Sequence, residues 1–213
     1  MSISALRERI LAALADSTAP RDPTLATPPS AYGDVPEGLR KRFAGRKTPA
    51  GVLIALLARG ADYHVLFTRR SPDLRHHPGQ VSFPGGRMES VDRDVTDAAL
   101  REAEEEVGLP RGHVSIAGYL EPHLTITGYA VTPVVGLIHQ GFTIRPDPAE
   151  VEEAFEVPLD FLMDPHNLHR AWREFEGTEI PVYEYHYGGH RIWGATASML
   201  VTLHHKLEKH LKQ

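Results

Sequence analysis

The chain has 213 residues, a length that suits one domain with terminal additions and is sufficient to bury a hydrophobic core. Its net charge of −5 gives no reason to expect a nucleic acid or an anionic membrane as a partner. It contains no cysteine, which excludes disulfides, thiolate metal sites and a cysteine nucleophile. Such a chain suits a reducing compartment, and we expect a cytoplasmic protein.

The first 48 residues are expected to form a helix and an arm before the main domain. Residues 1–16 mix arginine and glutamate with regularly spaced apolar residues, which indicates an amphipathic helix and not a signal peptide. Residues 17–38 are rich in Pro, Thr, Ala and Asp, as in a linker. The main domain is therefore placed at residues 49–213.

Strand-like runs dominate the middle of the chain. Their apolar and β-branched composition predicts four strands, at Gly51–Ala58, Tyr63–Arg69, Val114–Leu120 and Tyr129–Ile138. The apolar runs within them are far shorter than the ~18 residues of a membrane span, so no membrane association is expected.

The C-terminal third alternates between helical and strand-like patterns. Residues 146–163 predict a short helix, a short strand and the start of another helix. Residues 174–194 alternate and contain YGGHR, which indicates a hairpin. Residues 195–212 predict a closing amphipathic helix. Trp172 and Trp193 are interpreted as core residues in preference to a platform for stacking bases.

One predicted helix, between the second and third strands, is unusually acidic. Asp92, Asp94 or Thr96 can cap its start, and Gly108 can end it. Four of its residues within five positions are glutamates, and like charges one turn apart cost a helix about 0.2–0.5 kcal/mol per pair. They are Glu102, Glu104, Glu105 and Glu106.

Helical geometry separates these glutamates into two groups. At about 100° per residue, Glu102, Glu105 and Glu106 share one side, whereas Glu104 points away from them. Three carboxylates on one ridge suit a hard divalent cation such as Mg²⁺ or Mn²⁺; a solvated acidic face is the alternative. The turn at residues 84–86 favours the cation, because glycine lets a backbone carbonyl approach it. Arg101 can orient Glu105 through charge-assisted hydrogen bonds.

The acidic stretch resembles the Nudix box, G-x(5)-E-x(7)-R-E-U-x-E-E-x-G-U with U apolar. Residues 101–109, REAEEEVGL, match its second half completely. The first half matches if one residue is inserted before Arg101, with Gly86 as the glycine and Asp92 in place of the first glutamate. The resemblance implies an α/β protein, the Nudix α/β/α sandwich, in which a mixed β-sheet lies between helices.

The segment before the box narrows this resemblance. Residues 66–86, LFTRRSPDLRHHPGQVSFPGG, place Arg69, Arg70 and Arg75 close to the expected cation. Arginine forks match phosphate oxygens; a solvated basic loop is the alternative. The segment is similar to L-L-T-x-R-S-x(3)-R-x(3)-G-x(3)-F-P-G-G, the signature of the coenzyme A pyrophosphatase branch, and the similarity extends over roughly residues 49–200.

This resemblance implies hydrolysis of the pyrophosphate bond of coenzyme A (CoA) or its derivatives, with Mg²⁺ or Mn²⁺ as cofactor. The products are 3′,5′-ADP and 4′-phosphopantetheine. Glu102 and Glu106 are the first choice as metal ligands, with the Gly85 carbonyl as a backbone ligand. Glu105 is a third ligand or the base that activates water. Glu150, Glu152 and Glu153 are the other candidate bases, of which Glu150 is favoured, with a surface position as the alternative for each.

The same resemblance places the substrate contacts on the preceding segment, at Arg70, Arg75, Gly79 and Phe83. His76 and His77 are expected to line that segment or face solvent. The partner is a small molecule, and a homodimer is left open. Two other readings remain: a Nudix hydrolase of another nucleoside diphosphate derivative, or a nucleotide-binding regulator, against which the intact glutamates argue.

Overall fold

The computed structural model describes residues 2–28, 39, 43–75, 77–139 and 141–211. A mixed sheet lies at its centre, in which β1 (Thr48–Arg59) pairs parallel with β7 (Tyr129–Ile138) and antiparallel with β2 (Asp62–Arg70). The other strands of this sheet pair antiparallel with those three: β3 (Val81–Ser82), β4 (Gly85–Arg87), β5 (Val114–Tyr119), β6 (His123–Leu124) and β8 (Val151–Pro158). The four predicted strands are confirmed to within a few residues.

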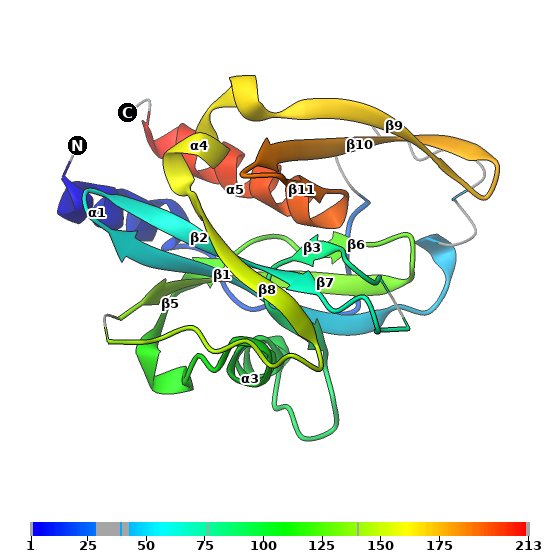
Figure 1. Ribbon diagram of the computed structural model, residues 1–213, viewed down its shortest axis with the longest axis horizontal. Coiled ribbons are helices and arrows are strands. Elements are labelled where there is room, and N and C mark those ends of the chain that lie inside the picture. Colours follow the sequence, from blue (N-terminus) through cyan, green and yellow to red (C-terminus); the bar gives the residue numbers. More distant parts are fainter. Residues whose placement is uncertain (1, 29–38, 40–42, 76, 140, 212–213) are drawn as a thin grey trace.

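Helices cover both faces of the sheet (Figure 1). Helix α3 (Val95–Val107) lies on one face, and α1 (Ile3–Leu14) and α5 (Ala195–Leu211) lie on the other. Successive side chains of β1 pack on opposite faces of the sheet: Leu53 is buried with residues of α3, whereas Ile54 is buried with residues of α1 and α5. Successive side chains of a strand point to opposite faces of the sheet, so a strand that is covered on both faces has apolar residues at successive positions. The expected α/β/α arrangement is confirmed.

A second, antiparallel sheet of three strands lies beside α5. It consists of β9 (His169–Phe175), β10 (Thr178–Tyr187) and β11 (His190–Trp193), reached through the short helix α4 (Leu159–Met163). The predicted hairpin is confirmed as β10–β11, and Gly188 and Gly189 supply the positive φ angles that its tight turn needs.

The N-terminal helix shares the core of the main sheet. Ile10 and Leu14 are fully buried, in the cluster that holds Ile54 and Leu203. The following arm is described as far as residue 28, and the rest of its predicted span lies outside the described residues. In the described part of the chain, no helix is long and apolar enough to cross a membrane.

One local prediction is wrong. The segment at residues 146–163 was expected to begin with a short helix, but residues 148–150 form a turn and β8 starts at Val151. Asp147 precedes Pro148, and the residue before a proline is disfavoured in the helical conformation. The chain instead closes one turn, in which the Asp147 carbonyl accepts from the N–H groups of Glu150 (3.0 Å) and Val151 (2.8 Å).

Candidate active site

Helix α3 carries the glutamates and is fixed at both ends. The Asp94 side chain accepts a hydrogen bond from the N–H of Asp97 (2.8 Å) at its start, and Gly108 ends it with a φ of 68°. The structure therefore selects Asp94 among the three predicted caps. Ala103 and Val107 are buried against the sheet, and this orientation determines which glutamates reach the sheet's edge.

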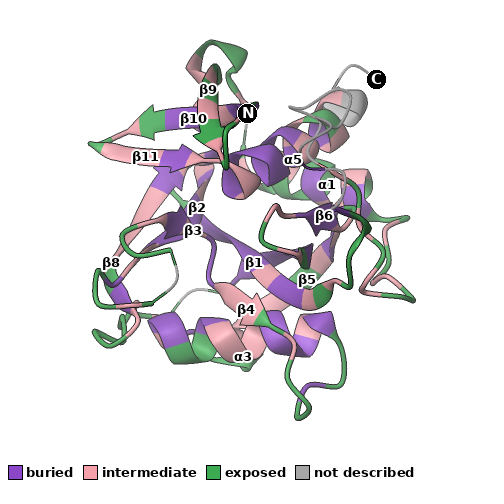
Figure 2. Cartoon of the chain, turned by 90° about the vertical axis from the view of Figure 1, so that its right-hand side faces the viewer, coloured by how far each residue is buried: buried purple, intermediate pink, exposed green. Residues whose placement is uncertain are grey.

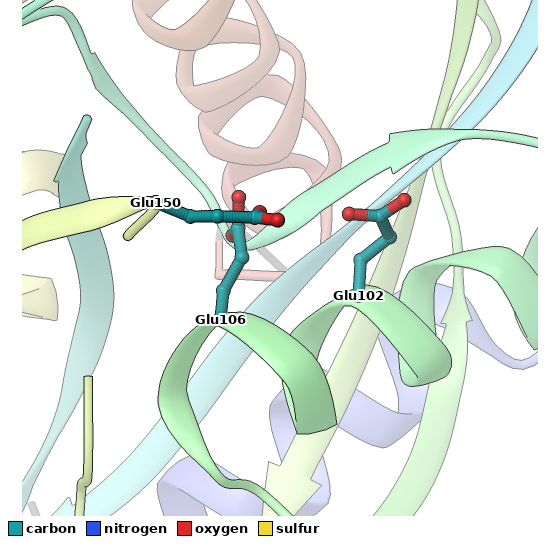
Figure 3. Close-up of side chains that lie close together, drawn as sticks. All are labelled: Glu102, Glu106 and Glu150. Carbon is teal, nitrogen blue, oxygen red and sulfur yellow. The ribbon is translucent and has the colours of Figure 1, made fainter. Parts of the chain in front are cut away.

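Three carboxylates meet where α3 approaches the start of β8 (Figure 3). Glu102 and Glu106 project from successive turns of α3, and Glu150 reaches them from the turn before β8. Each offers an oxygen within 4.8 Å of the others. We call these residues the glutamate trio. Glu105, predicted as a third ligand or base, lies outside it with 56% of its side chain exposed.

The segment before β8 holds Glu150 against the end of α3. The Asp147 N–H donates to the Glu106 carbonyl (3.0 Å), and the Asp147 carbonyl accepts from the Glu150 N–H (3.0 Å). The Asp147 side chain accepts from the Ala149 N–H (2.9 Å), and the Glu150 carbonyl accepts from the Ser71 N–H (2.8 Å). The last carbonyls of a helix have no hydrogen-bond donors within the helix. The segment therefore supplies a donor to the C-terminal end of α3 and also places Glu150 beside Glu102 and Glu106.

The electrostatics of the trio are unfavourable without a cation. Glu106 is 1% exposed; it accepts from the Gly85 N–H (3.2 Å) and pairs with Arg70 Nη1 at 3.4 Å. Burial raises the pKa of Glu106 to about 8, although Arg70 and Gly85 act in the opposite direction. Burial likewise raises the pKa of Glu102.

This donor set fits a hard divalent cation. The trio supplies only oxygen ligands, which Mg²⁺ and Mn²⁺ prefer, and they converge from two elements that are rigidly held. A cation there would restore the charged form of the buried Glu106 carboxyl by replacing its lost hydration.

Glycines in β4 allow this close approach. A Cβ added to Gly86 would overlap the Glu102 carboxylate, and one added to Gly85 would overlap the Gly51 carbonyl of β1. Gly85 also has a φ of 151°, which side chains disfavour. Packing of β4 on the backbone of β1 therefore requires glycine at position 85, whereas glycine at position 86 leaves room for the Glu102 carboxylate.

Arg101 organises the outer side of the trio. The predicted hydrogen bond to Glu105 is confirmed at 2.9 Å, and Arg101 also donates to Glu102 at 2.9 Å. Its Nε and Nη2 bind the two oxygens of Asp92, each at 3.0 Å. These hydrogen bonds lower the pKa of Asp92. The aspartate that replaces the first glutamate of the motif thus holds Arg101, a role that the sequence left open.

The three arginines of the preceding segment point in different directions. Arg70 pairs with Glu106, whereas Arg69, the adjacent residue of β2, pairs with Glu152 and Glu153 of β8. Arg75 is exposed and does not line the cavity beside the trio. Only Arg70 thus supports the predicted cradle for phosphates.

The other expected substrate contacts are placed unevenly. Phe83 borders the cavity, but it is 1% exposed and stacks on Phe67 with ring centroids 5.1 Å apart. Gly79 is exposed, has a φ of 67° and does not line the cavity. His77 lines it, and His76 lies outside the described residues.

A cavity of about 690 Å³ opens from the trio and runs between the main sheet and the second sheet. In Figure 2, β9–β11 and α5 lie above β1, β4 and α3. Glu102, Glu150 and Arg70 line its polar end. The other walls are mostly apolar and come from β1, β7, β9, β10, β11, α5 and the segment at residues 124–127; they include Leu124, Ile126, Ile180, Val182, Trp193 and Met199.

Of the two tryptophans predicted to lie in the core, only Trp193 packs against a core cluster, the one that holds Leu124 and Ile180. Trp172 is 59% exposed, so its assignment to the core is wrong. Trp193 is half-buried and lines the cavity. Sequence alternation predicts that a strand has two faces, but it does not say which face meets the cavity, so no local signal identifies Trp193.

Comparison with known proteins agrees with this geometry. A sequence model of the NUDIX domain matches residues 47–203. The protein named uncharacterized Nudix hydrolase NudL from Photorhabdus laumondii is 41% identical over 160 residues, which cover 75% of this chain and 85% of that protein. Peroxisomal coenzyme A diphosphatase NUDT7 of Mus musculus is 40% identical over 136 residues, covering 64% of this chain and 58% of that protein.

Proposed function

Because the chain belongs to the Nudix hydrolase family, with the family's domain over residues 47–203, we propose that it hydrolyses the pyrophosphate bond of CoA or its derivatives. The observation that carries this proposal is the cavity of about 690 Å³ that continues from the glutamate trio. A diphosphate alone would occupy only its polar end. The remaining volume calls for a substrate with a large organic group attached to the diphosphate.

The residues of the polar end have separate tasks. We assign Glu102 and Glu106 as cation ligands, with the Gly85 carbonyl as a backbone ligand. A bound divalent cation would neutralise the diphosphate and acidify an attacking water. Arg70, whose side chain is 25% exposed, can donate to a phosphate oxygen while it stays beside Glu106. Charge-assisted contacts of this type orient the diphosphate.

Glu150 is our choice for the group that receives the proton of the attacking water. It is the exposed member of the trio, so it can meet water and substrate more readily than the buried Glu106. Glu105 pairs with Arg101 (2.9 Å) on the exposed side of α3. It is therefore assigned to holding Arg101 and not to the reacting atoms.

Two further points favour CoA over other diphosphates. The mouse relative at 40% identity is named as a coenzyme A diphosphatase. The apolar part of the cavity at Leu124, Ile126 and Met199 also suits a long uncharged arm better than a second charged nucleotide, because an unpaired charge on an apolar surface is costly. The competing reading is a Nudix hydrolase that prefers another nucleoside diphosphate derivative.

A panel of substrates tests the proposal. With Mg²⁺ or Mn²⁺, CoA, an acyl-CoA, ADP-ribose and a dinucleoside polyphosphate are compared by kcat/KM, with product identification. We expect CoA or its acyl derivative to exceed the others by at least about 10-fold. A preference for ADP-ribose or the dinucleotide would replace CoA by the competing substrate class, and no hydrolysis of any compound would favour a binding protein.

Glu150→Gln tests the assignment of the base. We expect kcat to fall by about 100-fold or more, within the range of general-base catalysis, while the affinity for Mn²⁺ falls less than in Glu106→Gln. An equal loss of Mn²⁺ affinity in both variants would make Glu150 a ligand instead. Glu104→Gln is the matched control, because Glu104 lies on the same helix as Glu106 but is exposed.

A further inference from the structure

One wall of the cavity carries an aromatic ring beside a fixed cation. Trp193 of β11 lines the cavity together with Phe175 of β9. The guanidinium carbon of Arg191 lies 5.0 Å from the centroid of the Trp193 ring. Because β10 pairs Glu184 with Trp193, the carboxylate that holds this arginine stands next to the ring on the same face of the sheet.

Glu184 fixes Arg191 in this position. Its Oε2 accepts from Arg191 Nε (2.9 Å) and Nη2 (2.6 Å), and also from Arg173 Nη2 (3.3 Å). His186 Nε2 lies 3.1 Å from its other oxygen. Glu184 is 9% exposed, so a single buried carboxylate holds two guanidinium groups and the cluster keeps an excess of positive charge.

Part of this cluster still has unused hydrogen-bonding capacity. Arg173 Nε is buried without a hydrogen-bond partner, and a buried donor without a partner is unfavourable. The side chains of Arg173 and Arg191 are 42% and 34% exposed, respectively. Arg191 lies two residues before Trp193 in β11 and therefore on the same face of the sheet, and Arg173 of β9 reaches that face through its hydrogen bond to Glu184.

We propose that Trp193, Arg191 and Arg173 form a subsite for the purine nucleotide half of the substrate. The base stacks on Trp193, and a phosphate monoester on its ribose meets the two arginines. Every base offers a π-face to an aromatic ring, and a guanidinium fork matches a phosphate. The pantetheine arm of CoA has no aromatic group and no phosphate beyond the diphosphate. This inference rests on the proposed function for the identity of the nucleotide, 3′,5′-ADP.

The tryptophan content provides a direct test. The chain has two tryptophans, so Trp172→Phe leaves Trp193 as the single fluorescent reporter. Trp172 is 59% exposed and does not line the cavity. In EDTA, without hydrolysis, we expect 3′,5′-ADP to quench Trp193 saturably and 4′-phosphopantetheine to leave it unchanged. Quenching by phosphopantetheine alone, or by neither compound, would overturn the subsite.

Calorimetry of variants separates stacking from folding. Trp193→Leu should bind 3′,5′-ADP about 5- to 150-fold more weakly, the range for loss of one stacked base, and Trp193→Phe should restore part of this affinity. Circular dichroism checks that both variants keep the fold. Equal affinity in wild type and Trp193→Leu would contradict the stacking.

The arginines are tested by a ratio of affinities. Wild type should bind 3′,5′-ADP at least about 10-fold more tightly than 5′-AMP, since a charge-assisted hydrogen bond to the extra phosphate is worth that much. Arg191→Ala should reduce this ratio, and Arg191→Lys should restore part of it. Arg170→Ala, which removes the arginine near Trp172, is the matched control.

If Arg191→Ala left the ratio of the affinities for 3′,5′-ADP and 5′-AMP unchanged, the role of Arg191 would be structural and its contact with the phosphate would be refuted. The outcome is separable from the hydrolysis panel. If CoA is not hydrolysed but 3′,5′-ADP still quenches Trp193, the proposed function fails and the nucleotide subsite stands.

Discussion

Replacing Glu106 by glutamine should stabilise the metal-free protein at alkaline pH. In the folded chain, burial raises the pKa of Glu106 to about 8, against 4.5 for a free carboxyl. The fold therefore favours the protonated form. Its contribution to stability is complete below about pH 4.5 and is lost as the pH rises through about 8.

The magnitude follows from the gap between the two pKa values. At about 1.4 kcal/mol per pH unit, a gap of about 3.5 units corresponds to as much as 5 kcal/mol, roughly, in the free energy of unfolding. Glutamine has almost the volume of glutamate and stays neutral at every pH. Its side-chain oxygen can still accept from the Gly85 N–H, which lies 3.2 Å from Glu106 Oε2.

Urea unfolding in EDTA at pH 5 and at pH 8.5 measures this effect. Wild type and Glu106→Gln should have similar stability at pH 5, and the variant should be more stable by several kcal/mol at pH 8.5, about 2–5. Glu104→Gln controls for the loss of an exposed charge in the same helix. Added Mn²⁺ should stabilise wild type far more than Glu106→Gln, because a ligand of the folded state alone shifts the equilibrium.

Two results would refute the reasoning. A stability difference that is the same at both pH values would show that Glu106 does not change its protonation between them. A variant that is less stable than wild type at pH 8.5 in EDTA would show that the buried Glu106 carboxylate does not destabilise the folded protein.

Three further variants address the supports of the site. Gly86→Ala should displace the Glu102 carboxylate, which an added Cβ would overlap; we expect kcat/KM to fall by at least about 10-fold with little change in melting temperature, and unchanged activity would contradict this. Asp147→Ala should weaken Mn²⁺ binding, measured by calorimetry, whereas Asp164→Ala, which removes a similar side-chain bond to the backbone N–H two residues on, should not. Arg101→Lys should lower activity and destabilise the protein by about 1–3 kcal/mol in urea unfolding, because an ammonium cannot replace the guanidinium fork; wild-type values of both would refute the role.

Local patterns in the sequence determined most of the secondary elements and the two members of the glutamate trio that lie on α3. Apolar residues at successive positions of β1 predicted a strand covered on both faces, and the structure confirms it. Asp94 and Gly108 marked the limits of α3 as candidate caps. Within one helix, spacing alone placed Glu102 and Glu106 on the same side, because the helix repeat relates residues four positions apart.

Tertiary packing decided the rest of the site. Glu150 joins the trio only because β8 pairs with β2 and the preceding turn bonds to the end of α3. Arg69 and Arg70 are neighbours in sequence, yet one pairs with β8 and the other with Glu106, since successive side chains of a strand point to opposite faces. Trp193 meets the cavity for the same reason. The repeat of apolar residues along a helix or strand depends on residues close together in the sequence, so the sequence alone predicts it. Which face of a strand is covered, and by which distant segment, depends on the packing of the whole chain.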